Sequence, residues 1–181
     1  AWGEHGLIDK RQFYEESVRV PMLAYCPGLI QPGTQIANMI YNVDIAPTIL
    51  DIAGVKKAPQ MRGISFLPLL KGETVTKWRD KVYYEYYWED AFPQTPTTFG
   101  VRTDRYKYIR YHGIWDTNEF YDLQEDPYEM NNLIKSPKHQ KLIEELNNDL
   151  YDWLESSGGM NIPLKKTVRY RDGDHRNQKV Y

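Results

Sequence analysis

The 181-residue sequence contains a single cysteine, Cys26, and no hydrophobic run that approaches the ~18 residues of a membrane-spanning helix. One cysteine excludes an internal disulfide framework and a cysteine-based zinc site. Neither sign of charge dominates, because 23 Lys and Arg stand against 25 Asp and Glu. This near-neutral balance gives no global electrostatic footprint for nucleic acid or an anionic membrane. We therefore expect neither a nucleic-acid partner nor a membrane span.

The sequence is instead rich in aromatic residues, with 15 Tyr and 5 Trp, and 41% of its residues are hydrophobic. A chain of this length and composition can bury one good-sized core or two small ones. Aromatic residues concentrate in strand-rich cores, interfaces and carbohydrate sites. For most of them we favour packing in a sheet.

The first half of the chain predicts an α/β fragment. Residues 19–27 form a short apolar run between two prolines, which suits a buried strand. Residues 42–44 offer an N-cap for a helix whose apolar face runs to Ala53, with Gly54 at the C′ position. Residues 65–70 predict one or two further helical turns. A strand, a turn and a helix in this order are typical of an α/β layer.

The second half predicts an antiparallel sheet covered by a helix. Residues 81–88 and 118–123 have the aromatic content of strands, and residues 99–103 and 106–111 alternate as a hairpin does. Short turns between successive strands imply antiparallel pairing. A helix is expected from Pro137 to about residue 155, because leucines recur there at every fourth position.

The expected fold class is therefore α/β to α+β: the edge of an α/β sandwich followed by a small antiparallel four-stranded sheet packed on a C-terminal helix. The expected domains are residues 1–75, the remnant of an α/β domain, and residues 76–159, the sheet with its helix. Residues 160–181 are expected to form an extended basic tail.

Three stretches carry a family resemblance: residues 3–21, which contain GEHGLIDKRQFYEE, residues 42–54, and residues 101–133. In this order and spacing they resemble the sulfatase family, within the alkaline-phosphatase-like superfamily. The turn at 111–118 and the stretch at 157–164 are similar to bacterial sulfatases that act on N-acetylglucosamine-6-sulfate in mucin or glycosaminoglycans.

The resemblance implies hydrolysis of sulfate esters with a formylglycine, made from Cys or Ser in a C/S-x-P-x-R motif, and a calcium ion held by Asp and Asn residues. Cys26 does not match that motif, because proline follows it directly and no arginine comes after. The chain also begins at Ala1 without an initiator methionine. We expect a C-terminal part of a sulfatase that is inactive alone, with calcium and formylglycine in the complete protein and no metal ligand in this chain.

Two candidate catalytic residues lie in the first stretch. Lys10 matches the family lysine, whose ammonium would stabilise charge on the sulfate oxygens and orient the attacking group. Without the motif, a solvated loop lysine would be the more common outcome. His5 would donate a hydrogen bond or a proton near neutral pH, or else brace its loop. Glu15 and Arg19 have the spacing of a buried ion pair that shapes this loop.

Candidate substrate-binding residues lie in the turn between the third and fourth strands. Trp115 would stack on a sugar ring, while His112 and Asp116 would hydrogen-bond its hydroxyl groups. The alternative is structural, with Trp115 capping the sheet and Asp116 ending a turn.

Two other functions stay open. One is a phosphodiester or phosphonate hydrolase of the same superfamily. The other is a non-catalytic glycan-binding module whose aromatic platform would be Tyr86, Tyr87, Trp88 and Trp115.

The expected partner is a sulfated carbohydrate substrate. We also expect exposed apolar faces near Met22 and Ile49, which would meet a missing N-terminal segment or a second copy of the chain. A periplasmic or secreted location follows from the resemblance alone.

Overall fold

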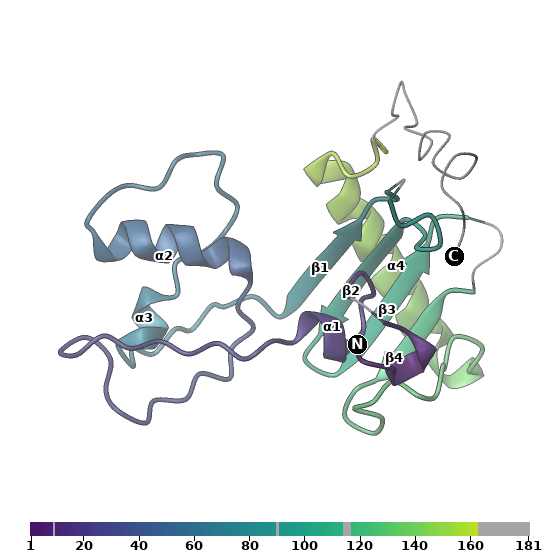
Figure 1. The fold of residues 1–181 in the computed structure, drawn as a ribbon, viewed down its shortest axis with the longest axis horizontal. Coiled ribbons are helices and arrows are strands. Elements are labelled where there is room, and N and C mark those ends of the chain that lie inside the picture. Colours follow the sequence, from purple (N-terminus) through teal and green to yellow (C-terminus); the bar gives the residue numbers. More distant parts are fainter. Residues whose placement is uncertain (9, 90, 114–116, 163–181) are drawn as a thin grey trace, which may run out of the picture. The chain divides into compact units, whose positions relative to one another are not determined.

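The computed structural model describes residues 1–8, 10–89, 91–113 and 117–162, which fold into two compact units. Ala1–Val20 and the chain from Tyr83 onward form the first unit, and Pro21–Val82 form the second (Figure 1). None of the helices in the described ranges is long and apolar enough to cross a membrane.

A four-stranded antiparallel sheet is the centre of the first unit, with strand order β1-β2-β3-β4. The strands are β1 (Lys81–Tyr86), β2 (Thr98–Thr103), β3 (Tyr106–Tyr111) and β4 (Glu119–Asp122). Val101 pairs with Tyr108 across β2 and β3. The predicted hairpin, sheet and sequential strand order are therefore confirmed.

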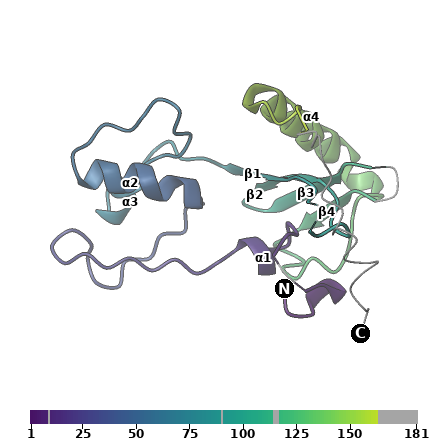
Figure 2. The same cartoon turned by 45° about the horizontal axis from the view of Figure 1, so that its top comes forward.

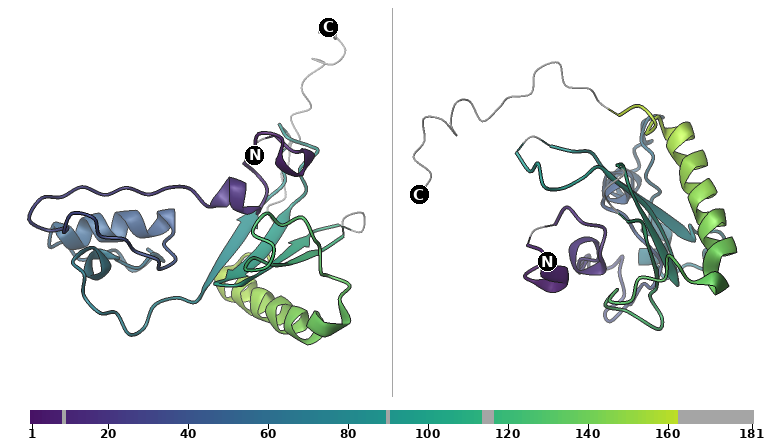
Figure 3. Two further views of the ribbon diagram at one scale, coloured as in Figure 1. Left: turned by 90° about the horizontal axis from the view of Figure 1, so that it is seen from below. Right: turned by 90° about the vertical axis from the view of Figure 1, so that its right-hand side faces the viewer.

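Helix α4 (Gln140–Ser157) covers one face of this sheet, as Figures 2 and 3 show. A short 3-10 helix, η3 (Pro137–His139), precedes it, and Gly158 ends it in the left-handed conformation with φ 81°. One stripe of the helix is buried against the sheet and consists of Ile143, Leu146, Leu150 and Leu154. The predicted helix and its covering role are confirmed.

The N-terminal residues cover the opposite face of the sheet (Figure 3). The rings of Phe13 and Tyr14 are buried there against Ile109 and Tyr121. This segment contains the 3-10 helix η1 (Glu4–Gly6) and the short helix α1 (Glu15–Val18). By contact, the first twenty residues group with the sheet unit, and the second unit runs from Pro21 to Val82.

The second unit contains the 3-10 helix η2 (Asn42–Asp44) and the helices α2 (Ile45–Ile52) and α3 (Leu67–Leu70). The predicted helices are confirmed, and Gly54 ends the first of them with φ 68°. The side chain of Asp44 does not cap α2. It is fully buried and instead accepts hydrogen bonds from Arg79 and from the N–H groups of Tyr41 and Ile64.

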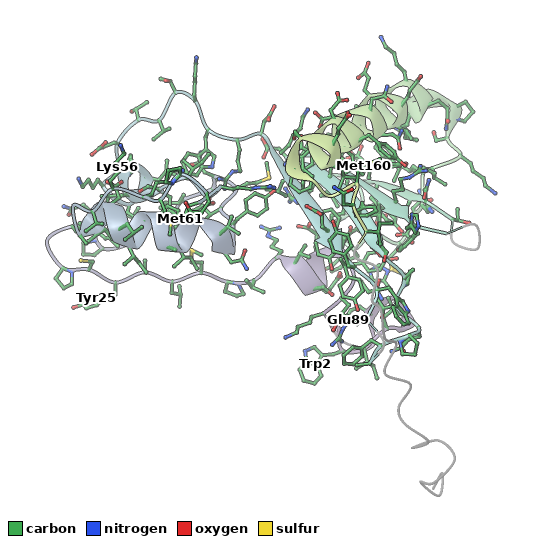
Figure 4. All side chains as sticks on the ribbon, turned by 90° about the horizontal axis from the view of Figure 1, so that it is seen from above. Trp2, Tyr25, Lys56, Met61, Glu89 and Met160 are labelled. Atoms are coloured by element: carbon green, nitrogen blue, oxygen red, sulfur yellow. The ribbon has the colours of Figure 1, made fainter. Side chains whose placement is uncertain are left out.

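The predicted buried strand over residues 19–27 is wrong. The segment is extended but has no strand assignment, and the side chains of Leu23 and Tyr25 are 97% and 91% exposed. Figure 4 shows Tyr25 projecting outward. A strand needs a hydrogen-bonded neighbour, and the described residues of this unit supply none to this segment. The expected apolar exposure is present, since Met22 is 46% exposed and Ile49 is 60% exposed.

Candidate functional site

Lys10 lies on a bend in the N-terminal segment, between η1 and α1, and is exposed. The buried rings of Phe13 and Tyr14 anchor this segment three and four residues further on. The sequence thus places an exposed lysine a few residues from side chains that are buried against the sheet. Its role in catalysis stays a prediction.

His5 is packed rather than open to solvent. Its ring stacks on that of Tyr14, with centroids 3.9 Å apart and planes 7° from parallel. Its side chain is 10% exposed, and Nε2 lies 3.6 Å from an oxygen of Glu16. His5 also has a left-handed backbone, with φ 56°. These are the contacts of a residue that braces the η1 loop, and they leave its catalytic role a prediction.

Three tyrosine hydroxyls meet on the carboxylate of Glu119. Tyr14 donates to it at 2.9 Å, Tyr111 at 3.0 Å and Tyr121 at 2.9 Å. Burial, reinforced by the charge of Glu119, raises the pKa of all three tyrosines well above the ordinary value. They therefore remain donors at neutral pH. Because Tyr14 carries the His5 ring, this cluster indirectly sets the position of the η1 loop.

A second polar cluster fixes the start of α1 to the sheet. Lys107 on β3 is fully buried, and its Nζ lies 2.8 Å from Glu15 and 2.7 Å from Glu129. It also donates to the carbonyl of Phe13 at 2.8 Å. Arg102 on β2 holds the other side of Glu15 with hydrogen bonds of 3.0 and 3.1 Å. Two cations thus balance two carboxylates between the sheet and the N-terminal segment.

The two carboxyl groups of this cluster respond differently to their surroundings. Burial raises the pKa of Glu129 above its ordinary value despite Lys107. Burial also opposes ionisation of Glu15, but hydrogen bonds from Arg102 and the charge of Lys107 hold its pKa below the usual range. The predicted buried pair of Glu15 with Arg19 is wrong, since Arg19 is 78% exposed and 4.0 Å away. Glu15 turns instead toward the sheet, where Arg102 is available.

His112 follows the end of β3 and is exposed. Its N–H donates to the carbonyl of Thr97 at 2.8 Å, which extends the β2–β3 pairing by one residue. It borders a cavity together with Phe99, Arg110, Tyr111, Gly113 and Tyr151. Trp115 and Asp116 lie outside the described residues, so their predicted roles stay predictions.

The aromatic residues after β1 do not present one open platform. The Tyr87 ring packs edge-on against Phe99, with centroids 5.9 Å apart, and its hydroxyl donates to Glu85 and to the carbonyl of Gly159. Trp88 is 38% exposed. Tyr87 therefore serves the sheet core, and the role of Trp88 stays a prediction.

The two tyrosine and lysine clusters were not predicted from the sequence. A signal for the second exists in hindsight, because Lys107 stands between apolar neighbours in a strand whose alternation points it inward. Within the described residues, no group of three or more His, Cys, Asp or Glu side chains could hold a metal ion.

Comparison with known families identifies residues 3–156 as a match to N-sulphoglucosamine sulphohydrolase, C-terminal. The N-acetylglucosamine-6-O-sulfatase of Bacteroides thetaiotaomicron is 36% identical over 176 residues, which cover 96% of this chain and 31% of that protein. The ulvan-active sulfatase of Formosa agariphila is 30% identical, over 86% of this chain and 36% of that protein. The chain thus spans about a third of the length of the curated relatives it matches.

Solved structures show the same fold. One, of a protein in complex with its substrate D-glucosamine-2-N,6-O-disulfate, matches 90% of this chain and 33% of its own, with 35% identity and a TM-score of 0.81. The phosphonate monoester hydrolase of Silicibacter pomeroyi covers 82% of this chain and 31% of its own, with 21% identity and a TM-score of 0.69. At that identity, the second likeness shows the fold alone.

Proposed function

This chain belongs to the sulfatase family, as a C-terminal region of it, and from that membership we propose that the protein containing it hydrolyses sulfate esters of sugars. The observation that carries the proposal is the 36% identity to an N-acetylglucosamine-6-O-sulfatase over 96% of this chain. The fold likeness to a protein in complex with a disulfated glucosamine supports a sulfated amino sugar as the substrate.

We propose that Lys10 is the catalytic residue of this chain. A sulfate ester develops negative charge on the leaving oxygen as the bond breaks, and a nearby ammonium stabilises that charge. An exposed lysine on a bend can reach a substrate held by another part of the protein. The buried anchor of Phe13 and Tyr14 limits how far the bend moves, which favours a defined position for the ammonium.

Calcium and formylglycine stay proposals for the complete protein. In such a sulfatase they would supply the nucleophile and hold the sulfate group. We propose that the other two thirds of the protein, by the length of its relatives, carry both. The periplasmic or secreted location expected from the resemblance stays a prediction, which fractionation of the source cells would test.

The exposed apolar side chains of the second unit support a further contact. Leu23 and Ile49 are 97% and 60% exposed, and exposed apolar side chains that gather in a patch mark interaction surfaces. We propose that they are covered by the rest of the sulfatase or by a second copy of the chain. Sedimentation of the chain alone tests the second copy, because self-association must weaken in a Leu23→Asp variant.

The experiment for the function is sulfate release from N-acetylglucosamine 6-sulfate by the complete protein, with calcium present. Activity is expected, and Lys10→Ala is expected to lower kcat by about 10²- to 10³-fold. Lys141→Ala is the control, because that lysine is 90% exposed on α4. Full activity of Lys10→Ala would remove Lys10 from the mechanism. Hydrolysis of a phosphonate monoester without sulfate release would favour the alternative hydrolase.

A further inference from the structure

The cavity at the end of β3 has a volume of about 350 Å³. Its walls come from two elements: the end of the β2–β3 hairpin and the Tyr151 turn of α4. Pockets for small ligands typically start near ~300 Å³. A cavity at this lower limit suits a single sugar rather than a long chain segment.

Arg110 is the charged side chain of this cavity, and its guanidinium contacts an aromatic ring and a neutral amide. Its guanidinium lies 5.1 Å from the Tyr151 ring centroid, and Nη1 reaches Asn147 Oδ1 at 3.4 Å. Among the described residues it forms no ion pair with a carboxylate. By contrast, Arg79 and Arg102 are each held by a carboxylate.

Arg110 is half-buried, and no carboxylate among the described residues pairs with its guanidinium, so these residues leave its positive charge unbalanced at the cavity wall. Such a group is stabilised by an anion that brings two acceptor oxygens, and sulfate and carboxylate both do so. Asn147 does not meet this need, because its oxygen is neutral and already accepts from the Tyr108 hydroxyl at 3.0 Å.

The remaining walls suit a sugar ring. Tyr151, half-buried on α4, supplies aromatic surface, and His112 adds an exposed imidazole that can donate or accept a hydrogen bond. Aromatic side chains that combine apolar area with a polar tip are suited to surfaces that are partly wet. An anion-binding cation beside aromatic walls is the chemistry of an acidic sugar site.

We propose that this cavity binds an anionic sugar through Arg110, with Tyr151 and His112 contacting the ring. The proposal rests on the proposed function for the choice of a carbohydrate as ligand. It does not need hydrolysis, because binding is measured on the 181-residue chain itself. Failure to bind would therefore leave sulfate release by the complete protein as a separate question.

The test is a titration of the isotope-labelled chain with N-acetylglucosamine 6-sulfate, followed by amide chemical shifts. Saturable shifts are expected at residues 110–113 and near Tyr151. Uncharged N-acetylglucosamine is expected to bind at least about tenfold more weakly, because it lacks the charge-assisted hydrogen bonds. Glucuronate separates the two sources of the anion: binding of both acids supports a general acidic-sugar site, and binding of the sulfated sugar alone supports a sulfate-specific one.

Arg110→Gln is expected to weaken binding of the sulfated sugar at least about tenfold. Lys141→Gln is the matched control, since it also removes one positive charge, ten residues before Tyr151 and about 15 Å along the helix. Amide spectra away from the cavity check that each variant folds, and Arg110→Lys replaces Arg110→Gln if the latter does not. Arg110→Lys keeps the charge but loses the two-pronged geometry, so weaker binding is again expected.

Three results would overturn the proposal. The first is the absence of saturable shifts at the cavity with either acidic sugar. The second is equal affinity for the sulfated and the uncharged sugar, or for inorganic sulfate and the sulfated sugar. The third is undiminished binding by the folded Arg110 variant.

Discussion

The ammonium of Lys107 lies 2.7 Å from the carboxylate of Glu129, and both side chains are completely buried. Glu129 also accepts the backbone N–H of Glu15 at 2.6 Å, so the pair connects three separate segments: β3, the residues after β4 and the start of α1. Glu129 adopts φ 52°, a conformation that few non-glycine residues take. The contacts around it hold the backbone there, which ties the N-terminal segment to the sheet.

Removing the cation of this pair is expected to destabilise the first unit strongly. Lys107→Met leaves the carboxylates of Glu15 and Glu129 close together without their shared ammonium, at a cost of about 3–5 kcal/mol. Protection of the β2 and β3 amides against hydrogen exchange measures this unit alone. Lys141→Met, an exposed pair with Glu145 at 3.9 Å, should change stability by less than about 0.5 kcal/mol. Equal effects of the two variants would contradict the buried pair.

Gly100 is expected to tolerate no side chain while Phe13 occupies its site. A Cβ at position 100 would lie 2.3 Å from Phe13 Cδ1, well inside contact distance. Gly100→Ala should therefore cost about 1–3 kcal/mol and loosen the N-terminal segment, measured as faster exchange of the α1 amides. In a Phe13→Leu background the same substitution should cost less, because the smaller side chain leaves room. Additive costs would mean that the two positions do not meet.

Acid is expected to weaken the second unit through Asp44. Burial opposes its ionisation, but Arg79 and the N–H groups of Ile64 and Tyr41 hold its pKa below the ordinary value of 3.8. A lowered pKa in the folded state contributes stability that is present above about pH 4 and lost as pH falls further. The protection of the Ile64 amide, 2.7 Å from Asp44 Oδ1, should decline in that range.

A substitution separates Asp44 from other carboxyl groups. Asp44→Asn should reduce Ile64 protection already at neutral pH and make it less dependent on acid. Asp51→Asn is the control on α2, the helix that follows Asp44, because the carboxylate of Asp51 accepts a hydrogen bond from the exposed hydroxyl of Ser65. A similar acid response in Asp44→Asn and in the parent would assign the effect to another group.

Alkali is expected to unfold the first unit rather than titrate its tyrosines one by one. Burial and then the charge of Glu119 raise the pKa of Tyr14, Tyr111 and Tyr121. A raised pKa in the folded state gives stability that is fully present below the unfolded value of about 10 and is lost as pH rises above it. Comparison with a Tyr121→Phe variant isolates the tyrosinate absorbance of the cluster, which should rise together with loss of circular dichroism. Ionisation of Tyr121 before unfolding would contradict the cluster.

Local sequence determined much of the second half. Alternation in residues 98–111 fixed the hairpin because each strand residue feels its own pleat and its nearest partner. The leucine stripe of α4 likewise depends only on helical spacing, and the burial of Leu150 and Leu154 follows from it. The motif around Lys10 identified the family for the same reason, since it is a contiguous run of residues.

Tertiary structure alone decided the contacts between distant segments. Lys107 and Glu15 are 92 positions apart, and neither spacing nor residue type indicates that they meet. The same holds for Asp44 with Arg79, and for Glu15, which prefers Arg102 on the sheet to its helical neighbour Arg19. Residues 19–27 have strand composition and no strand. Hydrogen bonding across a sheet and charge balance in a core both depend on a partner elsewhere in the chain, which a local pattern does not contain.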